Sequence, residues 1–215
     1  MAKIKQGILG GFSGKVANVV GTSWKGRAVM KSQPLSVANP KTEAQQEQRG
    51  KFSKIAELAS AVLTQFVQPV ENPISGDISG YNLFCKDNKA AFNTSGKLVE
   101  ADFVCGGGKI INVESPSVVA DVANQSVVLS WTNSAGLSAL RLSDTVYCAM
   151  FKEDGSVLGA NAAADGRANE AIGIGGGSLL QSFANGDKVF TLVACVSKDG
   201  RDVSVKTAAI KVTAA

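Results

Sequence analysis

The chain has 215 residues, of which 45% are hydrophobic and 19% are charged. This composition excludes a disordered chain, and the length allows one large domain or two small ones. The formal net charge is +4, but residues 1–54 hold ten Lys or Arg and two Glu, which is +8, so the remainder carries −4. Such asymmetry is typical of a nucleic-acid contact or of a basic arm that docks on an acidic neighbouring subunit.

Residues 1–38 are basic and rich in glycine, and we expect them to form an extended arm. Two short apolar runs, residues 16–20 and 28–31, predict a hairpin or a pair of extended segments. Glycines leave too little side-chain volume for a core, so the arm should gain order by packing on something else. The first charges are followed only by Ile8 and Leu9 before glycine, so no signal-peptide core is expected.

Residues 39–95 predict helices. Asn39 can cap free N–H groups and Pro40 suits the first helical position, so a helix should begin here. Pro69 and Pro73 should end it, and a second, shorter helix is expected over residues 81–92. The apolar stripe of the first helix has three- and four-residue spacing. Its members are Phe52, Ile55, Ala59, Val62, Leu63 and Phe66.

Residues 96–215 change to a period of two with turns about every ten residues, which predicts an antiparallel sandwich. Asp-Gly pairs at 153–156 and 198–201 predict hairpin turns, and Trp131 should anchor the core. Strands are expected near 99–104, 117–122, 126–132, 145–152, 156–161, 169–174, 187–197 and 202–212. The predicted fold class is therefore α+β: an extended β arm (1–38), a helical segment (39–95) and a β-sandwich (96–215).

No catalytic or cofactor site is predicted. The chain has no histidine, which removes the commonest base for nucleophile activation. Glycine-rich segments at 9–16, 103–110 and 173–178 each fail the spacing of a phosphate-binding loop. The carboxylate pairs Glu153/Asp154 and Asp199/Asp202 could in principle form the two-carboxylate site of a glycosidase. They lie in predicted turns, so we interpret them as solvent-exposed loop residues.

The four cysteines, Cys85, Cys105, Cys148 and Cys195, have no zinc-ligand spacing. They are expected to be reduced, buried thiols, as in proteins that mature in a cytoplasm. No apolar run approaches the roughly 18 residues of a membrane span, so no contact with a membrane is predicted.

Trp24 among cations is the most informative cluster. An aromatic ring beside Lys25, Arg27 and Lys31 could stack a base while the cations meet phosphates. Alternatively, Trp24 is the apolar anchor by which the arm docks, and the lysines are solvated. The full set of candidate residues for assembly or nucleic-acid contact is Lys15, Trp24, Lys25, Arg27, Lys31, Arg49 and Lys51.

The segments "GILGGFSGKVANVVGTSWKGRAVMKSQP" and "NPKTEAQQEQRGKF" resemble the N-terminal module of an uncharacterised family of Bacteroidetes-type bacteria and their phages. This module is similar to the head of phage structural proteins, with an Asn-Pro-x-Thr-x-x-Gln helix that continues as Gln-x-x-Arg-x-x-Phe. The helix is matched by Asn39, Pro40, Thr42, Gln45, Gln46 or Gln48, Arg49 and Phe52. The later half resembles a fibronectin type III or immunoglobulin-like sandwich.

The resemblance implies a virion component made in the bacterial cytoplasm. We therefore expect a non-enzymatic structural protein, capsid-associated or in the tail, that assembles with itself and other virion proteins through its arm, without cofactor or small-molecule substrate. Extended arms can add strands to a neighbour's sheet edge. The alternatives are nucleic-acid binding through the basic arm and a surface adhesin or carbohydrate-binding module.

Overall fold

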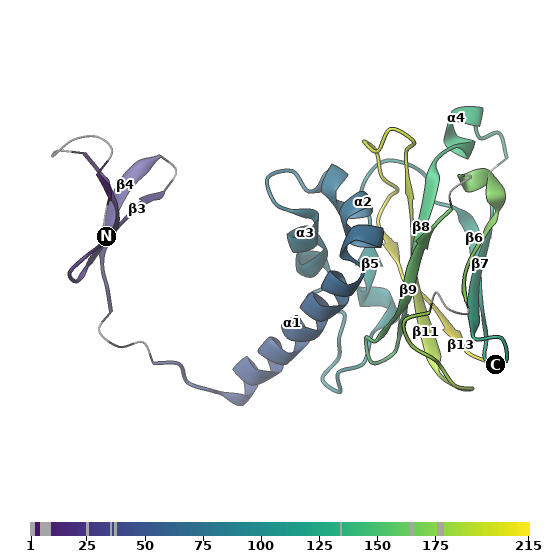
Figure 1. The fold of residues 1–215 in the computed structure, drawn as a ribbon, viewed down its shortest axis with the longest axis horizontal. Coiled ribbons are helices and arrows are strands. Elements are labelled where there is room, and N and C mark those ends of the chain that lie inside the picture. Colours follow the sequence, from purple (N-terminus) through teal and green to yellow (C-terminus); the bar gives the residue numbers. More distant parts are fainter. Residues whose placement is uncertain are drawn as a thin grey trace. The chain divides into compact units, whose positions relative to one another are not determined.

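The computed structural model describes residues 3–4, 10–24, 26–34, 36, 38–133, 135–163, 166–175 and 179–215. The chain divides into two units, Met1–Thr42 and Glu43–Ala215. Figure 1 shows the helices and strands of both units.

The first unit is a small antiparallel sheet. In spatial order its strands are β1 (Lys3–Ile4), β2 (Phe12–Val16), β3 (Val19–Trp24) and β4 (Arg27–Ser32). The prediction of one strand over residues 16–20 is wrong, because Ala17 and Asn18 form the turn between β2 and β3. Ala17 has a φ of 49°, a region that residues with a Cβ seldom adopt. Asn18, a residue type that turns favour, was the signal for this turn within the run.

The second unit opens with helix α1 (Glu43–Ala61). The prediction that Asn39 and Pro40 form its first turn is wrong, since α1 begins at Glu43. Ile55 and Ala59 of the predicted stripe are fully buried, but Phe52 is 58% exposed. Residues 43–50 are all exposed, and Figure 1 shows the start of α1 projecting beyond the helical layer. The stripe therefore becomes buried only where α1 reaches the sheet.

The helical path continues past Pro69, which was expected to end it. A π-helical turn (Leu63–Val67) leads into α2 (Gln68–Glu71) and a 3₁₀ turn (Asn72–Ile74). In the π turn the N–H of Val67 donates to the carbonyl of Val62, five residues earlier, at 3.1 Å. Proline lacks an N–H and its ring clashes with the carbonyl four residues before it. The widened turn lets Pro69 start a new helix.

Helix α3 (Gly80–Asp87) confirms the second helix, although it ends five residues before the predicted limit at residue 92. Ser79 caps it, because its hydroxyl accepts a hydrogen bond from the N–H of Asn82 at 3.3 Å. Phe92 instead forms an isolated antiparallel bridge with Leu98.

Two antiparallel sheets form the framework of residues 96–215. One has the order β10 (Ala171–Gly175), β7 (Ser126–Thr132), β6 (Glu114–Asp121). The other has the order β13 (Ile210–Thr213), β11 (Lys188–Val196), β8 (Thr145–Lys152), β9 (Val157–Ala162). A short helix, α4 (Ala139–Leu142), lies between β7 and β8 in the chain. The predicted α+β class with antiparallel sheets is confirmed.

Two predicted strands are wrong in extent. Residues 99–104 are mainly a 3₁₀ turn (Glu100–Asp102) followed by the two-residue strand β5 (Val104–Cys105). Residues 202–212 are divided into β12 (Thr207–Ala208) and β13. The division follows from two partners, because β12 pairs with β5 and β13 pairs with β11.

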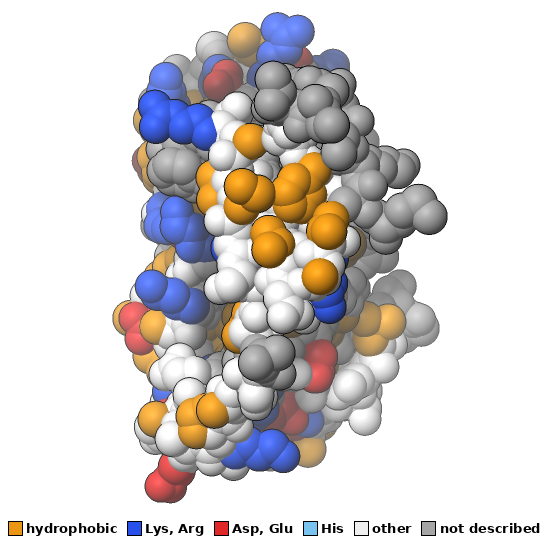
Figure 2. Space-filling model, turned by 90° about the vertical axis from the view of Figure 1, so that its left-hand side faces the viewer, with side chains coloured by type: hydrophobic (Ala, Val, Ile, Leu, Met, Phe, Trp, Pro, Cys, Tyr) orange, Lys and Arg blue, Asp and Glu red, His pale blue; other side chains and the backbone are white. Residues whose placement is uncertain are grey.

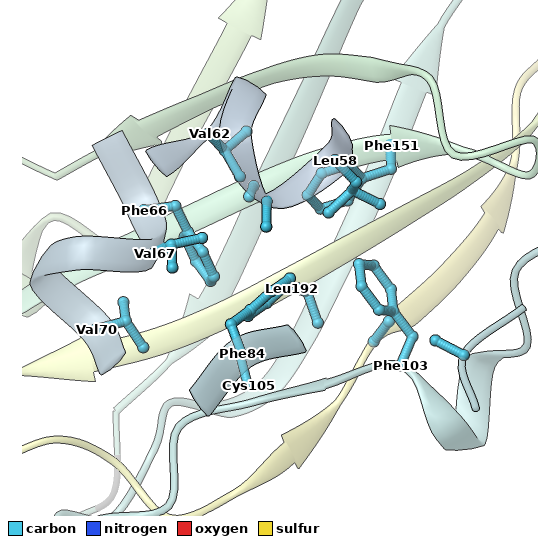
Figure 3. Close-up of a cluster of buried hydrophobic side chains, with 14 of the residues drawn as sticks. Leu58, Val62, Phe66, Val67, Val70, Phe84, Phe103, Cys105, Phe151 and Leu192 are labelled. Carbon is cyan, nitrogen blue, oxygen red and sulfur yellow. The ribbon is translucent and has the colours of Figure 1, made fainter. Parts of the chain in front are cut away.

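The second unit has three layers and two cores (Figure 1). One core lies between the helices and the four-stranded sheet, where Phe66 and Phe84 meet Phe151 and Leu192 (Figure 3). The other lies between the two sheets and contains Trp131, 3% exposed, as predicted. Strands β8 and β11 contribute alternate residues to both cores. The helices and the sheets thus share one unit.

Candidate functional site

The sheet of the first unit has two chemically different faces. Residues paired across antiparallel strands lie on the same face, and successive residues alternate between faces. The register pairs Lys15 with Val20 and Val20 with Lys31, and it pairs Gly21 with Met30. One face therefore holds the cations, with Val20 and Val29 between them, and the other holds Met30 and further apolar side chains without any described charge.

The basic face brings together three of the predicted residues. Lys15 and Lys31 flank Val20 in one row, and Arg27 lies on the same face of β4 as Lys31. All three cations are exposed. Neighbouring strands lie about 4.8 Å apart, so this face concentrates positive charge on a small surface.

The apolar face was missed by the sequence analysis. Its large side chains are Val16, Val19 and Met30, which are 54%, 39% and 70% exposed. Phe12 lies over Gly21, because a Cβ added at Gly21 would lie 2.6 Å from two atoms of the Phe12 ring. Figure 2 shows hydrophobic side chains gathered near the centre of the view. In β4, Arg27 and Lys31 alternate with Ala28 and Met30. This alternation was the signal in the sequence that could have revealed the apolar face.

The other predicted residues are distributed more widely. Trp24 pairs with Arg27 at the end of the β3–β4 hairpin, and Lys25 lies outside the described residues. Arg49 and Lys51 lie on α1 in the second unit. Lys51 forms an ion pair with Glu47 at 2.7 Å, one helical turn away. The structure therefore does not gather the seven residues in one unit.

The glycine-rich segment at 105–109 serves the fold. Gly107 and Gly108 donate hydrogen bonds to the carbonyl of Ser204 at 3.0 and 2.9 Å. A Cβ at Gly108 would overlap the carbonyl oxygen of Val203, so only glycine permits this close approach of two backbones.

Glu71 lies buried against the same glycine segment. Its Oε1 accepts a hydrogen bond from the N–H of Gly106 at 3.1 Å, and Oε2 is buried without a hydrogen-bond partner. Burial raises the pKa of Glu71 from 4.5 to about 7, against the opposing effect of the Gly106 hydrogen bond. The carboxyl is therefore partly protonated near neutral pH.

The carboxylates of the pair Glu153/Asp154 are engaged in ion pairs and turn hydrogen bonds. Glu153 forms ion pairs with Lys97 and Lys188, both at 3.0 Å, and hydrogen bonds from these lysines lower its pKa. Asp154 accepts a hydrogen bond from the N–H of Ser156 in the β8–β9 turn. These contacts stabilise turns and strand ends, as expected.

All four cysteines are buried and free. Burial raises the pKa of the Cys105 and Cys148 thiols to about 12 and that of Cys195 to about 11. Thiols with such pKa values carry little thiolate at neutral pH and react slowly.

Within the part of the chain that the structure describes, no group of three or more Cys, Asp or Glu side chains could hold a metal ion. Over the same residues, no helix is long and apolar enough to cross a membrane.

Comparison with known proteins gives a family but no activity. No curated protein matches the sequence. Residues 11–208 match the model of DUF6266, a family of unknown function. The match includes β2, β3 and β4 as well as the helices and both large sheets. The chain therefore belongs to the DUF6266 family.

Proposed function

We propose that the protein is a non-enzymatic structural component of a bacteriophage or prophage-derived particle, and that it forms a homomultimer through its first unit. One observation carries the assembly role: a small sheet exposes a whole apolar face. Val16, Val19 and Met30 on this face are between 39% and 70% exposed.

A sheet of this size needs a cover. Independent stability requires a hydrophobic face packed against something, and all six residues of β4 are exposed. β4 is also an edge strand, which leaves backbone groups available for pairing with another chain. Contact with further copies of the chain supplies both a cover for the apolar face and a strand that pairs with β4.

The particle setting rests on the resemblance of the first 70 residues to phage structural proteins. Capsid and tail placement are both compatible with it, and other virion proteins are the expected further partners. The buried titratable groups support the non-enzymatic part of the proposal, because Glu71 and the cysteines contact the fold's own backbone and core.

The sandwich is assigned here to the fibronectin type III-like class, as the sequence resemblance implies. Its first, second and fifth strands form one sheet, β6, β7 and β10. Its third, fourth, sixth and seventh strands form the other, with the third and sixth at the centre. This strand order supports the assignment, and the helical layer on the four-stranded sheet is an addition to it.

Removing the first unit should abolish assembly and leave the second unit folded. Among the residues of Met1–Thr42 that the structure describes, none belongs to either core of residues 43–215. The shortened chain should therefore unfold cooperatively but sediment as a monomer, while the full chain forms large species. Sedimentation velocity with negative-stain microscopy measures this, and large assemblies of the shortened chain would refute the proposal.

The two faces provide a matched pair of variants in the full chain. Val19→Ser with Met30→Gln makes the apolar face polar, and Val20→Ser with Val29→Gln makes the same changes on the basic face. The first pair should abolish the large species and the second should retain them. Equal behaviour of the two variants would contradict a role for the apolar face.

Nucleic-acid binding is the second candidate, favoured by the cations gathered on the basic face. It predicts that the logarithm of the binding constant falls linearly with the logarithm of salt concentration. Lys15→Gln and Lys31→Gln should each reduce that slope by about 1. Fluorescence anisotropy with a labelled single strand measures it, and a response to salt that is flat would exclude this function.

A further inference from the structure

The outer face of the β6–β7–β10 sheet is the open face of the sandwich. Its inner face borders the core between the two sheets, and the helices cover the far side of the four-stranded sheet. On the open face, Val119 is 60% exposed and Val128 is 40% exposed. The outward residues in the middle of the sheet are small and uncharged: Ser117, Val119, Val128, Ser130, Ala171 and Gly173.

These residues form two straight rows across three strands. Val119 pairs with Val128, and Val128 pairs with Gly173. Because Gly173 has no side chain, the surface of the sheet is recessed at this end of the row. Two sheets with such faces can stack at about 10 Å, the usual spacing between packed sheets. The open face therefore has the shape and polarity of a surface that receives another sheet.

Its charges are opposite to those of the first unit. Residues 110–140 and β10 contain no Lys or Arg, while Glu114, Asp121 and Glu170 lie at the ends of the strands. Hydrogen bonds from Asn124 lower the pKa of Asp121, so it is negative at neutral pH. Residues 1–42 contain seven Lys or Arg and no Asp or Glu. Lys15, Arg27 and Lys31 lie on the face opposite the apolar one, so the opposite charges of the two surfaces attract them to each other while the apolar side chains form the contact.

We infer that the apolar face of the first unit docks on the open face of β6, β7 and β10 in a second copy of the chain. This inference rests on the assembly role proposed above and identifies the receiving surface. Because the two surfaces differ, the contact is head-to-tail and leaves a free donor and a free acceptor at the ends. Such contacts build rings or filaments.

The length of the connection favours a second copy over the same chain. Residues 33–42 link strand β4 to α1, and ten residues span at most roughly 35 Å. Within the second unit, α1 and the open face lie on opposite sides of the four-stranded sheet (Figure 1). With layers about 10 Å apart, a straight path to a docked sheet is already roughly 30 Å. The linker must also pass around the body.

Cysteine cross-linking between two proteins tests the inference. One full-length protein carries Met30→Cys and the other carries Val128→Cys, each with a different tag. The native cysteines are all buried, so background cross-linking is low. After mixing, co-assembly and mild oxidation, the expected product is a dimer that contains both tags.

Two controls use other exposed positions, outside the proposed contact. Val29→Cys, on the basic face, replaces Met30→Cys, and Leu140→Cys on α4 replaces Val128→Cys. Val29 is 39% exposed and Leu140 is 66% exposed. Neither control should give the mixed dimer, and equal yields from them would overturn the inference.

The remaining outcomes separate this inference from the assembly role. Large assemblies without the mixed dimer would place the receiving surface elsewhere and leave the assembly role intact. A protein that carries both cysteines and cross-links only within one chain would overturn the choice of a second copy. Monomers throughout would overturn both proposals.

Discussion

Glu71→Gln is expected to raise the free energy of unfolding by about 3 kcal/mol at about pH 8 and to change it little near pH 4. Gln keeps an oxygen that can accept the hydrogen bond from the N–H of Gly106. It also resembles the protonated carboxyl, because its amide places a neutral group at the position of the buried Oε2. The variant therefore removes the cost of ionising a carboxyl inside the protein.

The direction follows from the pKa values of the two states. The carboxyl of Glu71 titrates near 4.5 in the unfolded chain and near 7 in the fold. Between these values the folded protein binds more protons, so the contribution of Glu71 to stability falls as the pH rises through this window. Above the folded pKa the full cost, about 3 kcal/mol, remains. Gln has no such dependence.

Urea unfolding of both proteins from about pH 4 to pH 8 measures the effect as a difference between two curves. The difference should grow through the window and then level off. Glu57→Gln, an exposed position on α1, makes the same change in net charge and should change stability by less than about 0.5 kcal/mol. A constant difference between wild type and Glu71→Gln would show that folding does not shift the pKa of the Glu71 carboxyl.

Regular strands were predictable because their side chains carry the information locally. The predictions for β7 and β8 match the observed residues 126–132 and 145–152. Apolar residues at every second position, β-branched residues and the Asp-Gly turn at 153–156 determine where these strands begin and end within a few residues. Gly155 indeed has a φ of 91° in this turn.

Elements that depend on distant partners were not predictable in the same way. Residues 202–212 read as one strand, yet the segment divides because β5 and β11, far apart in sequence, each pair with a part of it. The helix continues past Pro69 because of the π-helical turn at Leu63–Val67, and helix propensities of single residues do not predict such a turn. In both cases the deciding contact is tertiary.

The candidate site was predicted by composition but not by geometry. The basic residues of the first 38 were correctly recognised as a concentration of charge. Their separation from Val16, Val19 and Met30 requires the register of three strands, which depends on the turn at Ala17. If residues 16–20 are taken as one strand, the residues of the two faces are assigned wrongly. The receiving surface could not be found from the sequence, because its small residues are significant only side by side.

Arg167→Ala is expected to lower the free energy of unfolding by about 3–5 kcal/mol. Arg167 is fully buried, and its guanidinium donates to three oxygens that lie far from it in sequence. Nε bonds the Asn133 side-chain oxygen at 2.9 Å, and the two Nη atoms bond the carbonyls of Ile111 and Asn112 at 2.7 and 2.5 Å. Alanine leaves these acceptors without partners and opens a cavity.

Arg167→Lys provides the control that separates charge from geometry. Lysine keeps the positive charge and much of the length, but one ammonium cannot reproduce the planar fork that reaches three acceptors. The indole of Trp131 also donates to the carbonyl of Arg167 at 3.0 Å, so tryptophan fluorescence reports on this region during urea unfolding. Lysine should therefore cost about 2 kcal/mol, less than alanine but clearly measurable. Full stability in the lysine variant would mean that buried charge alone, and not the fork, holds residues 111–112 against the sandwich.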